Sequence, residues 1–206
     1  FKDLIQREIK APNFKTKEEL FDFIQPYSIE NYAINHFRKQ NNIVLFGLQS
    51  IEELTTFSMK PLSKPLLEKI PIAKKDIVYK LSTLILTYVG IFNSKKQDKN
   101  KVNLLISIIC ILHDDNTLVD EFFMQIIKIM RKSPNHEILL LSWQIFLIIS
   151  SLFVVKDPEV SNVIRWFLIH NIYEKDIIGE YANYTFIRFY ERSIIGRNFH
   201  SDIQNQ

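Results

Sequence analysis

The sequence is poor in cysteine and glycine, and each shortage excludes a class of site. It contains one cysteine and four glycines in 206 residues. A single cysteine cannot form an internal disulfide, and Cys110 lies in the apolar run NLLISIICILH without a CxxC partner, so we expect a buried thiol. Four isolated glycines cannot build the phosphate-binding, dinucleotide-binding or serine-hydrolase motifs.

Metal-binding and catalytic side chains are not grouped in the sequence either. The five histidines lack the HxxxH or His/Cys spacing of a zinc site: His36, His113, His136, His170 and His200. The acidic stretch HDDNTLVDE at residues 113–121 lacks the glycine of a calcium loop, and carboxylates complement the dipole at a helix start. We therefore expect these acids to cap a helix, and we predict no catalytic residue, metal, cofactor or enzyme activity.

Neither sign of charge is in large excess. The 26 lysines and arginines and 23 acids give a net charge of +3, so we predict no nucleic-acid partner. Residues 1–14 are charged and lack the unbroken apolar segment of a signal peptide. We therefore expect a cytoplasmic location.

Lysines nevertheless gather in three parts of the sequence. Those at residues 60–75 and 91–101 could form a basic patch for an acidic partner, such as a tubulin tail or an anionic membrane surface. The acids between them favour an ordinary solvated rim, and the third group could serve a helix C-terminus. The candidate partner-binding residues are Lys60, Lys64, Lys69, Lys74, Lys75, Lys95, Lys96, Lys99, Lys101, Lys128, Arg131 and Lys132.

Helices are predicted from apolar periodicity and from capping signals. In residues 74–90, KKDIVYKLSTLILTYVG, the apolar positions follow one helical face, and Gly90 is suited to a C-terminal stop. Asp157 followed by Pro158 indicates a helix start. Capping-box spacing indicates three more: Thr16 with Glu19, Ser50 with Glu53, and Thr117 with Asp120.

One segment, residues 138–155, is apolar enough to be weighed as a membrane span. The run ILLLSWQIFLIISSLFVV has no charge, but serines and a glutamine interrupt it and no basic cluster flanks it. We therefore predict the buried central helix of a bundle and no transmembrane segment. The predicted fold is all-α, one compact bundle of roughly six to ten helices, with residues 1–50 as an N-terminal helical extension and 51–206 as the main bundle.

Two prolines and a leucine pair stand together at residues 55–67, TTFSMKPLSKPLL. This segment and four others, in order, resemble the myosin tail homology 4 domain of unconventional myosins: YSIENYAINHFRK (27–39), FSMKPLSKPLLEKI (57–70), LVDEFFMQIIKIMRKSPN (118–135), SWQIF (142–146) and YANYTFIRFYERSIIGR (181–197). Val119, Met124 and the pair Leu141–Ser142 depart from the pattern at packing positions. The resemblance predicts that the prolines and leucines fix an extended segment that lays the first helix of the bundle on the core.

The resemblance is strongest to the myosin VII class, and it implies a non-catalytic module that acts with a following FERM domain. The implied partners are that FERM domain, protein cargo or the myosin's own motor domain, in autoinhibition and in actin-rich protrusions or adhesions at the cell cortex. An adaptor of a kinesin-like or Rho GTPase-activating protein, binding microtubules or anionic membrane through basic patches, is the alternative. Microtubule binding is a minor expectation, because residues 161–171, SNVIRWFLIHN, offer only Arg165 and His170 as basic groups.

Overall fold

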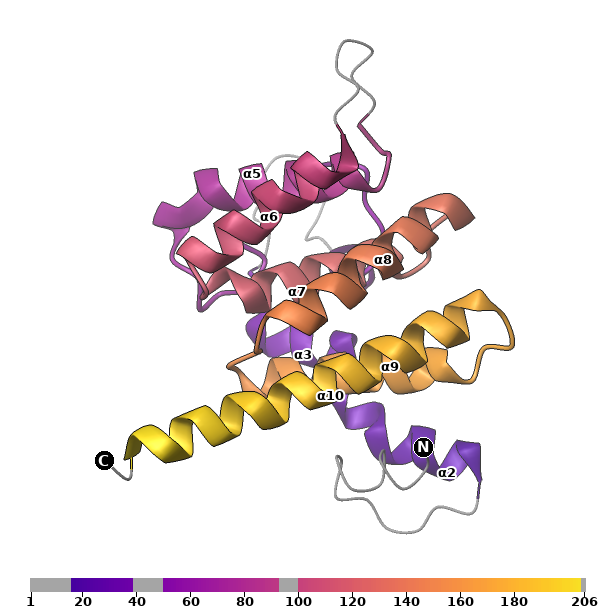
Figure 1. Cartoon of the computed structure of the whole chain (residues 1–206). Helices are drawn as coiled ribbons and strands as arrows, with labels where there is room; N and C mark the ends of the chain where they lie inside the picture. Colours follow the sequence, from indigo (N-terminus) through magenta and orange to yellow (C-terminus); the bar gives the residue numbers. More distant parts are fainter. Residues whose placement is uncertain (1–15, 39–49, 93–99, 205–206) are drawn as a thin grey trace.

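The computed structural model describes residues 16–38, 50–92 and 100–204 (Figure 1). Side chains are described as far as residue 194. The described helices are α2 (Lys17–Ile24), α3 (Ile29–His36), α4 (Ile51–Thr55), α5 (Lys75–Tyr88), α6 (Lys101–Asp114), α7 (Leu118–Met130), α8 (His136–Leu152), α9 (Pro158–Ile172) and α10 (Ile177–Gln204). Short 3₁₀ turns, η1 (Gln25–Tyr27) and η2 (Ile72–Lys74), precede α3 and α5. The predicted all-α fold is confirmed.

Most of the predicted helix starts and stops are present. Thr16 accepts a hydrogen bond from the amide of Glu19, and Ser50 forms both halves of a capping box with Glu53. Asp157 accepts from two amides of the first turn of α9. Gly90 follows α5 with φ of 88°, a conformation that favours glycine.

The predicted start at Thr117 is correct, but the predicted capping box there is wrong. The Thr117 side chain makes no cap hydrogen bond to α7. Its hydroxyl instead donates to the carboxylate of Asp115 at 2.7 Å, and Asp120 is paired with a lysine of another segment. Local spacing therefore predicted the boundary. The box does not form, because Thr117 bonds to the neighbouring Asp115 and Asp120 bonds to the distant Lys69.

The helix at the centre of the bundle is α7, and this corrects the identity of the central helix. All thirteen residues of α7 are buried, including four polar ones, Asp120, Glu121, Gln125 and Lys128. By contrast, α8 buries one side, where Trp143 stacks against Phe146 and Phe167, and leaves Leu152 43% exposed. Helix α8, which holds the longest apolar run, thus forms one side of the bundle. Helix α7 takes the centre, where each of its four polar side chains has at least one hydrogen-bond partner.

The helices form two groups around α7 (Figure 1). At one end, α5 and α6 pack against each other, and α10 packs along α8 and α9 on the other side. Residues of α3 contact both α4 and α9, so the described part of the N-terminal extension packs on the main bundle. The boundary at residue 50 stays a prediction.

No helix in the described parts of the chain is long and apolar enough to cross a membrane. These parts also contain no β-strand, and their one isolated β-bridge pairs Phe37 with Leu67 in antiparallel orientation.

Candidate partner-binding site

A buried carboxylate on α7 holds the proline and leucine segment in place. Glu121 Oε1 accepts a hydrogen bond from the Leu66 amide at 2.8 Å, and Oε2 accepts one from the Leu67 amide at 2.9 Å. The amide of Gln125 donates to Oε1 at 2.9 Å. Burial raises the pKa of Glu121, while these three donors act in the opposite direction. The irregular segment that ends in the leucine pair is therefore fixed to the central helix through its backbone.

The third basic group, Lys128, Arg131 and Lys132 at the end of α7, makes contacts with other parts of the bundle. Lys128 is buried, and its ammonium donates to the carbonyls of Glu53 and Thr56 at the end of α4, each at 2.6 Å. Arg131 pairs with Glu30 and Lys132 pairs with Glu52. Burial lowers the pKa of Lys128 to about 8. These cations therefore hold α4 and α3 against the C-terminal end of α7.

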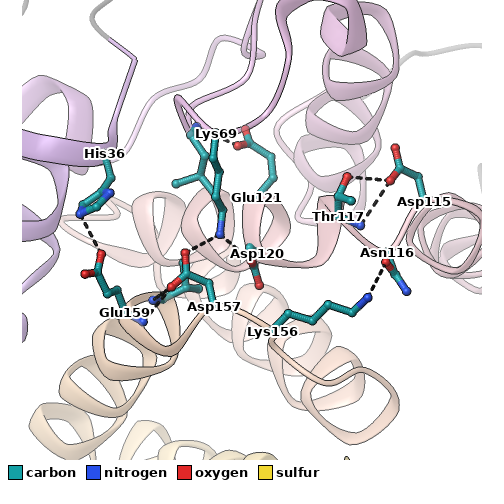
Figure 2. Close-up of polar contacts among 12 residues, drawn as sticks. His36, Lys69, Asp115, Asn116, Thr117, Asp120, Glu121, Lys156, Asp157 and Glu159 are labelled. Carbon is teal, nitrogen blue, oxygen red and sulfur yellow. Dashed lines mark hydrogen bonds and ion pairs between the residues drawn. The ribbon is translucent and has the colours of Figure 1, made fainter. Parts of the chain in front are cut away.

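A pocket of about 490 Å³ lies where α5, α7 and α9 begin. Figure 2 shows its polar contacts, which join side chains from the segment before α5 to residues at the starts of α7 and α9. Its lining residues are Lys69, Ile70, Pro71, Lys74, Asn116, Thr117, Asp120, Lys156 and Asp157. Helix N-termini carry partial positive charge, so the starts of these helices add to the field of the lysines.

The central contact of this pocket is a lysine shared by two aspartates. The Lys69 ammonium lies 2.7 Å from Asp120 Oδ2 and 2.5 Å from Asp157 Oδ2 (Figure 2). Burial works to lower the pKa of Lys69, but its bonds to the two carboxylates outweigh burial and raise it. Burial works to raise the pKa of Asp157, and its bond to Lys69 outweighs burial and lowers it. Lys69 thus joins the starts of α7 and α9.

The rim of the pocket holds a second pair and a less constrained lysine. Lys74 contacts Asp115 Oδ2 at 2.5 Å and the Thr117 hydroxyl at 2.8 Å. Burial works to raise the pKa of Asp115, and its bonds to Lys74 and Thr117 lower it overall. Lys156 is exposed and donates to the amide oxygen of Asn116 at 3.0 Å, a neutral partner. Lys156 is therefore a rim cation that no carboxylate holds among the residues that the structure describes.

The structure separates the lysines that the sequence grouped. Lys69 and Lys74 line the pocket, whereas Lys60, Lys75 and Lys101 are exposed outside its lining and Lys64 is half-buried. Lys95, Lys96 and Lys99 lie outside the described residues. Sequence reasoning missed Lys156, since no local pattern shows that a lone lysine 87 positions after Lys69 borders the same pocket.

The expectation of a buried cysteine is wrong. Cys110 is exposed on α6, because the apolar run of this helix places only one of its sides against α5 and α7. In the parts of the chain that the structure describes, no group of three or more His, Cys, Asp or Glu side chains could hold a metal ion.

Comparison with known proteins gives a family match for part of the chain. Residues 105–200 match the family model of the MyTH4 domain. No curated protein matches the sequence. The fold is similar to that of the Dictyostelium discoideum myosin VII MyTH4-FERM MF1 domain, with 18% identity, a TM-score of 0.64, and coverage of 86% of this chain and 34% of that chain.

Two further solved structures share the fold. The C-terminal MyTH4-FERM domain of human myosin 7b, solved in complex with the harmonin-a PDZ3 domain, is 20% identical with a TM-score of 0.60, over 80% of this chain and 31% of that chain. The myosin VII MyTH4-FERM MF2 domain of Dictyostelium discoideum is 15% identical with a TM-score of 0.65, over 78% of this chain and 34% of that chain. The chain thus spans about a third of the length of these structures.

Proposed function

We propose, from the premise that this chain contains a MyTH4 domain, that it is a partner-binding module in the tail of an unconventional myosin. The MyTH4 domain is non-catalytic, so the module acts by contact rather than by chemistry. It acts beside a FERM domain, binds protein cargo or its own motor domain, and works in actin-rich protrusions or adhesions at the cell cortex.

The observation that supports this proposal most is the match of residues 105–200 to the MyTH4 model, together with the similarity to MyTH4-FERM structures of myosin VII. One of those structures holds a PDZ domain, a folded protein partner. A bundle whose loops are fixed to a buried helix through Glu121 and Lys128 is a rigid scaffold, which keeps a docking surface in one shape.

We place the partner surface on the pocket at the starts of α5, α7 and α9. Lys156 is its exposed cation, and Lys69 and Lys74 lie beside it with their charges already balanced by aspartates. Lys60, Lys64, Lys75 and Lys101 remain candidates outside the pocket, as do Lys95, Lys96 and Lys99. Lys128 is left out of this surface, because its ammonium faces backbone carbonyls in the interior.

The coding sequence that surrounds this segment in its parent gene gives the first test. We expect a myosin motor upstream and FERM-like sequence downstream. A kinesin motor or a Rho GTPase-activating domain in the same gene would instead support the alternative, an adaptor that binds microtubules or anionic membrane.

A binding experiment separates the two functions on the protein itself. The chain and a variant with Lys95, Lys96, Lys99 and Lys101 changed to Glu are mixed with microtubules or with phosphatidylserine vesicles over a salt series. The proposal expects weak pelleting that the substitutions do not change. Strong pelleting of the unchanged chain that fades as salt rises and is lost in the variant would support the adaptor instead.

A further inference from the structure

Helix α6 lies at the outside of the bundle with an apolar side that no described residue covers. It packs against α5 and, less extensively, against α7. Val102 is 58% exposed and Ile106 is 51% exposed, and Cys110 is exposed one turn further on. The spacing of four residues places these three side chains in one row along the helix.

The charge pattern of α6 is unlike that of a solvated surface helix. Residues 102–112, VNLLISIICIL, contain no charged side chain, although an outer helix usually carries charges on its solvent side. Leu105 and Ile109 are half-buried beside the exposed row and widen it. A contiguous exposed apolar strip of this kind marks an interaction surface.

The ends of α6 indicate what covers this strip. Lys101 is exposed at the first position, and the side chain of Asp114 at the last position is 80% exposed. If two copies of α6 lie antiparallel, the Lys101 end of each copy meets the Asp114 end of the other. Both ends then pair opposite charges, whereas a parallel arrangement would place like charges together.

We propose that the protein forms a symmetric dimer in which the α6 helices of two copies pack antiparallel. A two-fold axis near the middle of α6 places Ile106 against Ile109 of the second copy, and Leu105 against its Cys110. The side chains that meet near the axis are apolar, Val102 lies against His113 of the second copy, and the charges of Lys101 and Asp114 lie at the two edges. This self-association is independent of the proposed partner pocket, which lies at the starts of other helices.

The first test measures mass by light scattering or sedimentation velocity across a concentration series, in reducing buffer so that Cys110 cannot form disulfides. We expect the average mass to rise with concentration toward twice that of one chain. Ile106→Glu should hold the protein at the monomer mass. Ile34→Glu is the matched control, since Ile34 is 56% exposed on α3, and it should leave the association unchanged.

A charge exchange tests whether the second copy is the occupant and whether it lies antiparallel. Lys101→Asp alone and Asp114→Lys alone place like charges at both edges, so each variant should associate less. An equimolar mixture of these two variants restores opposite charges at both edges and should dimerise again. A wild-type chain that stays monomeric at every concentration, or a mixture no better than its components, would overturn the proposal.

Discussion

Glu121 accepts a hydrogen bond from the backbone amide of Leu66 at 2.8 Å across 55 positions of the sequence, inside the core of the bundle. The same carboxylate holds the amide of Leu67, so both of its oxygens are used. A buried carboxylate is costly unless donors surround it, and here the donors belong to a loop that needs a fixed path. One side chain thereby satisfies the loop backbone and ties the loop to α7.

We predict that Glu121→Gln destabilises the fold by roughly 2–4 kcal/mol. The glutamine amide group would present its own donors to a backbone N–H that needs an acceptor, and that N–H would remain buried and unpaired. Urea denaturation followed by circular dichroism measures the change. Glu174→Gln, at an exposed position between α9 and α10, is the control and should change stability little. Equal stability of both variants would show that the Glu121 contacts contribute nothing.

Lys128 makes the stability of the fold depend on pH, and the direction of the effect follows from its lowered pKa. Its pKa is about 8 in the folded chain and near 10.5 when unfolded, so between these values the unfolded state binds more protons. Stability from this group therefore rises as pH increases from 8 to 10.5, by roughly 3 kcal/mol at most. Denaturation at several pH values should show this rise in wild type and in the exposed control Lys132→Met, but not in Lys128→Met.

Tyrosines titrate in the same pH range, so their contribution to the free energy of unfolding must be separated from that of Lys128. The pKa values of Tyr32, Tyr88 and Tyr173 are raised by burial, so their contribution to stability falls as pH rises through the tyrosine range. The wild type and both variants keep these tyrosines, and the difference between Lys128→Met and Lys132→Met isolates the lysine. Parallel pH profiles for the two variants would show that Lys128 is charged in the fold up to its ordinary range.

Removing the charge from each of two pocket lysines should change the stability of the fold by very different amounts. Lys69→Met leaves the buried Asp120 carboxylate without its ammonium partner and frees Asp157, and we expect a loss of roughly 1–3 kcal/mol, since Lys69 is partly exposed to solvent. Lys156→Met removes one bond to a neutral amide and should cost less than about 0.5 kcal/mol. Thermal or urea denaturation at neutral pH compares them, and equal losses would contradict the central role of Lys69.

The first turn of α10 requires a glycine for space, because it lies against the backbone that follows α9. A Cβ added at Gly179 would lie 2.1 Å from the carbonyl oxygen of Glu174, a backbone atom that cannot move away alone. Gly179→Ala should therefore cost more than about 2 kcal/mol. At Gly90 a Cβ meets nothing within 4 Å and only the φ of 88° opposes it, so Gly90→Ala should cost about 1 kcal/mol. A reversed order of these two losses in chemical denaturation would be evidence against this structure of the turn.

The sequence by itself determined the class of the fold and most helix boundaries. Periodicity and capping are local properties, so residues such as Ser50, Asp157 and Gly90 indicate their roles without any knowledge of the rest of the chain. The ordered motifs likewise led to the MyTH4 family, which the family model confirms for residues 105–200.

Only the tertiary structure decided which helix is central, which lysines form contacts inside the bundle and where a pocket forms. Apolar content favoured residues 138–155 as the central helix, but the helix that is buried on all sides is α7. Its charged residues Glu121 and Lys128 can be buried because they bond to backbone groups more than 50 positions away in the sequence. Whether a charged residue lies in the core depends on partners that no local pattern contains. For the same reason Lys156 and the exposed strip of α6 became visible only once the helices were packed.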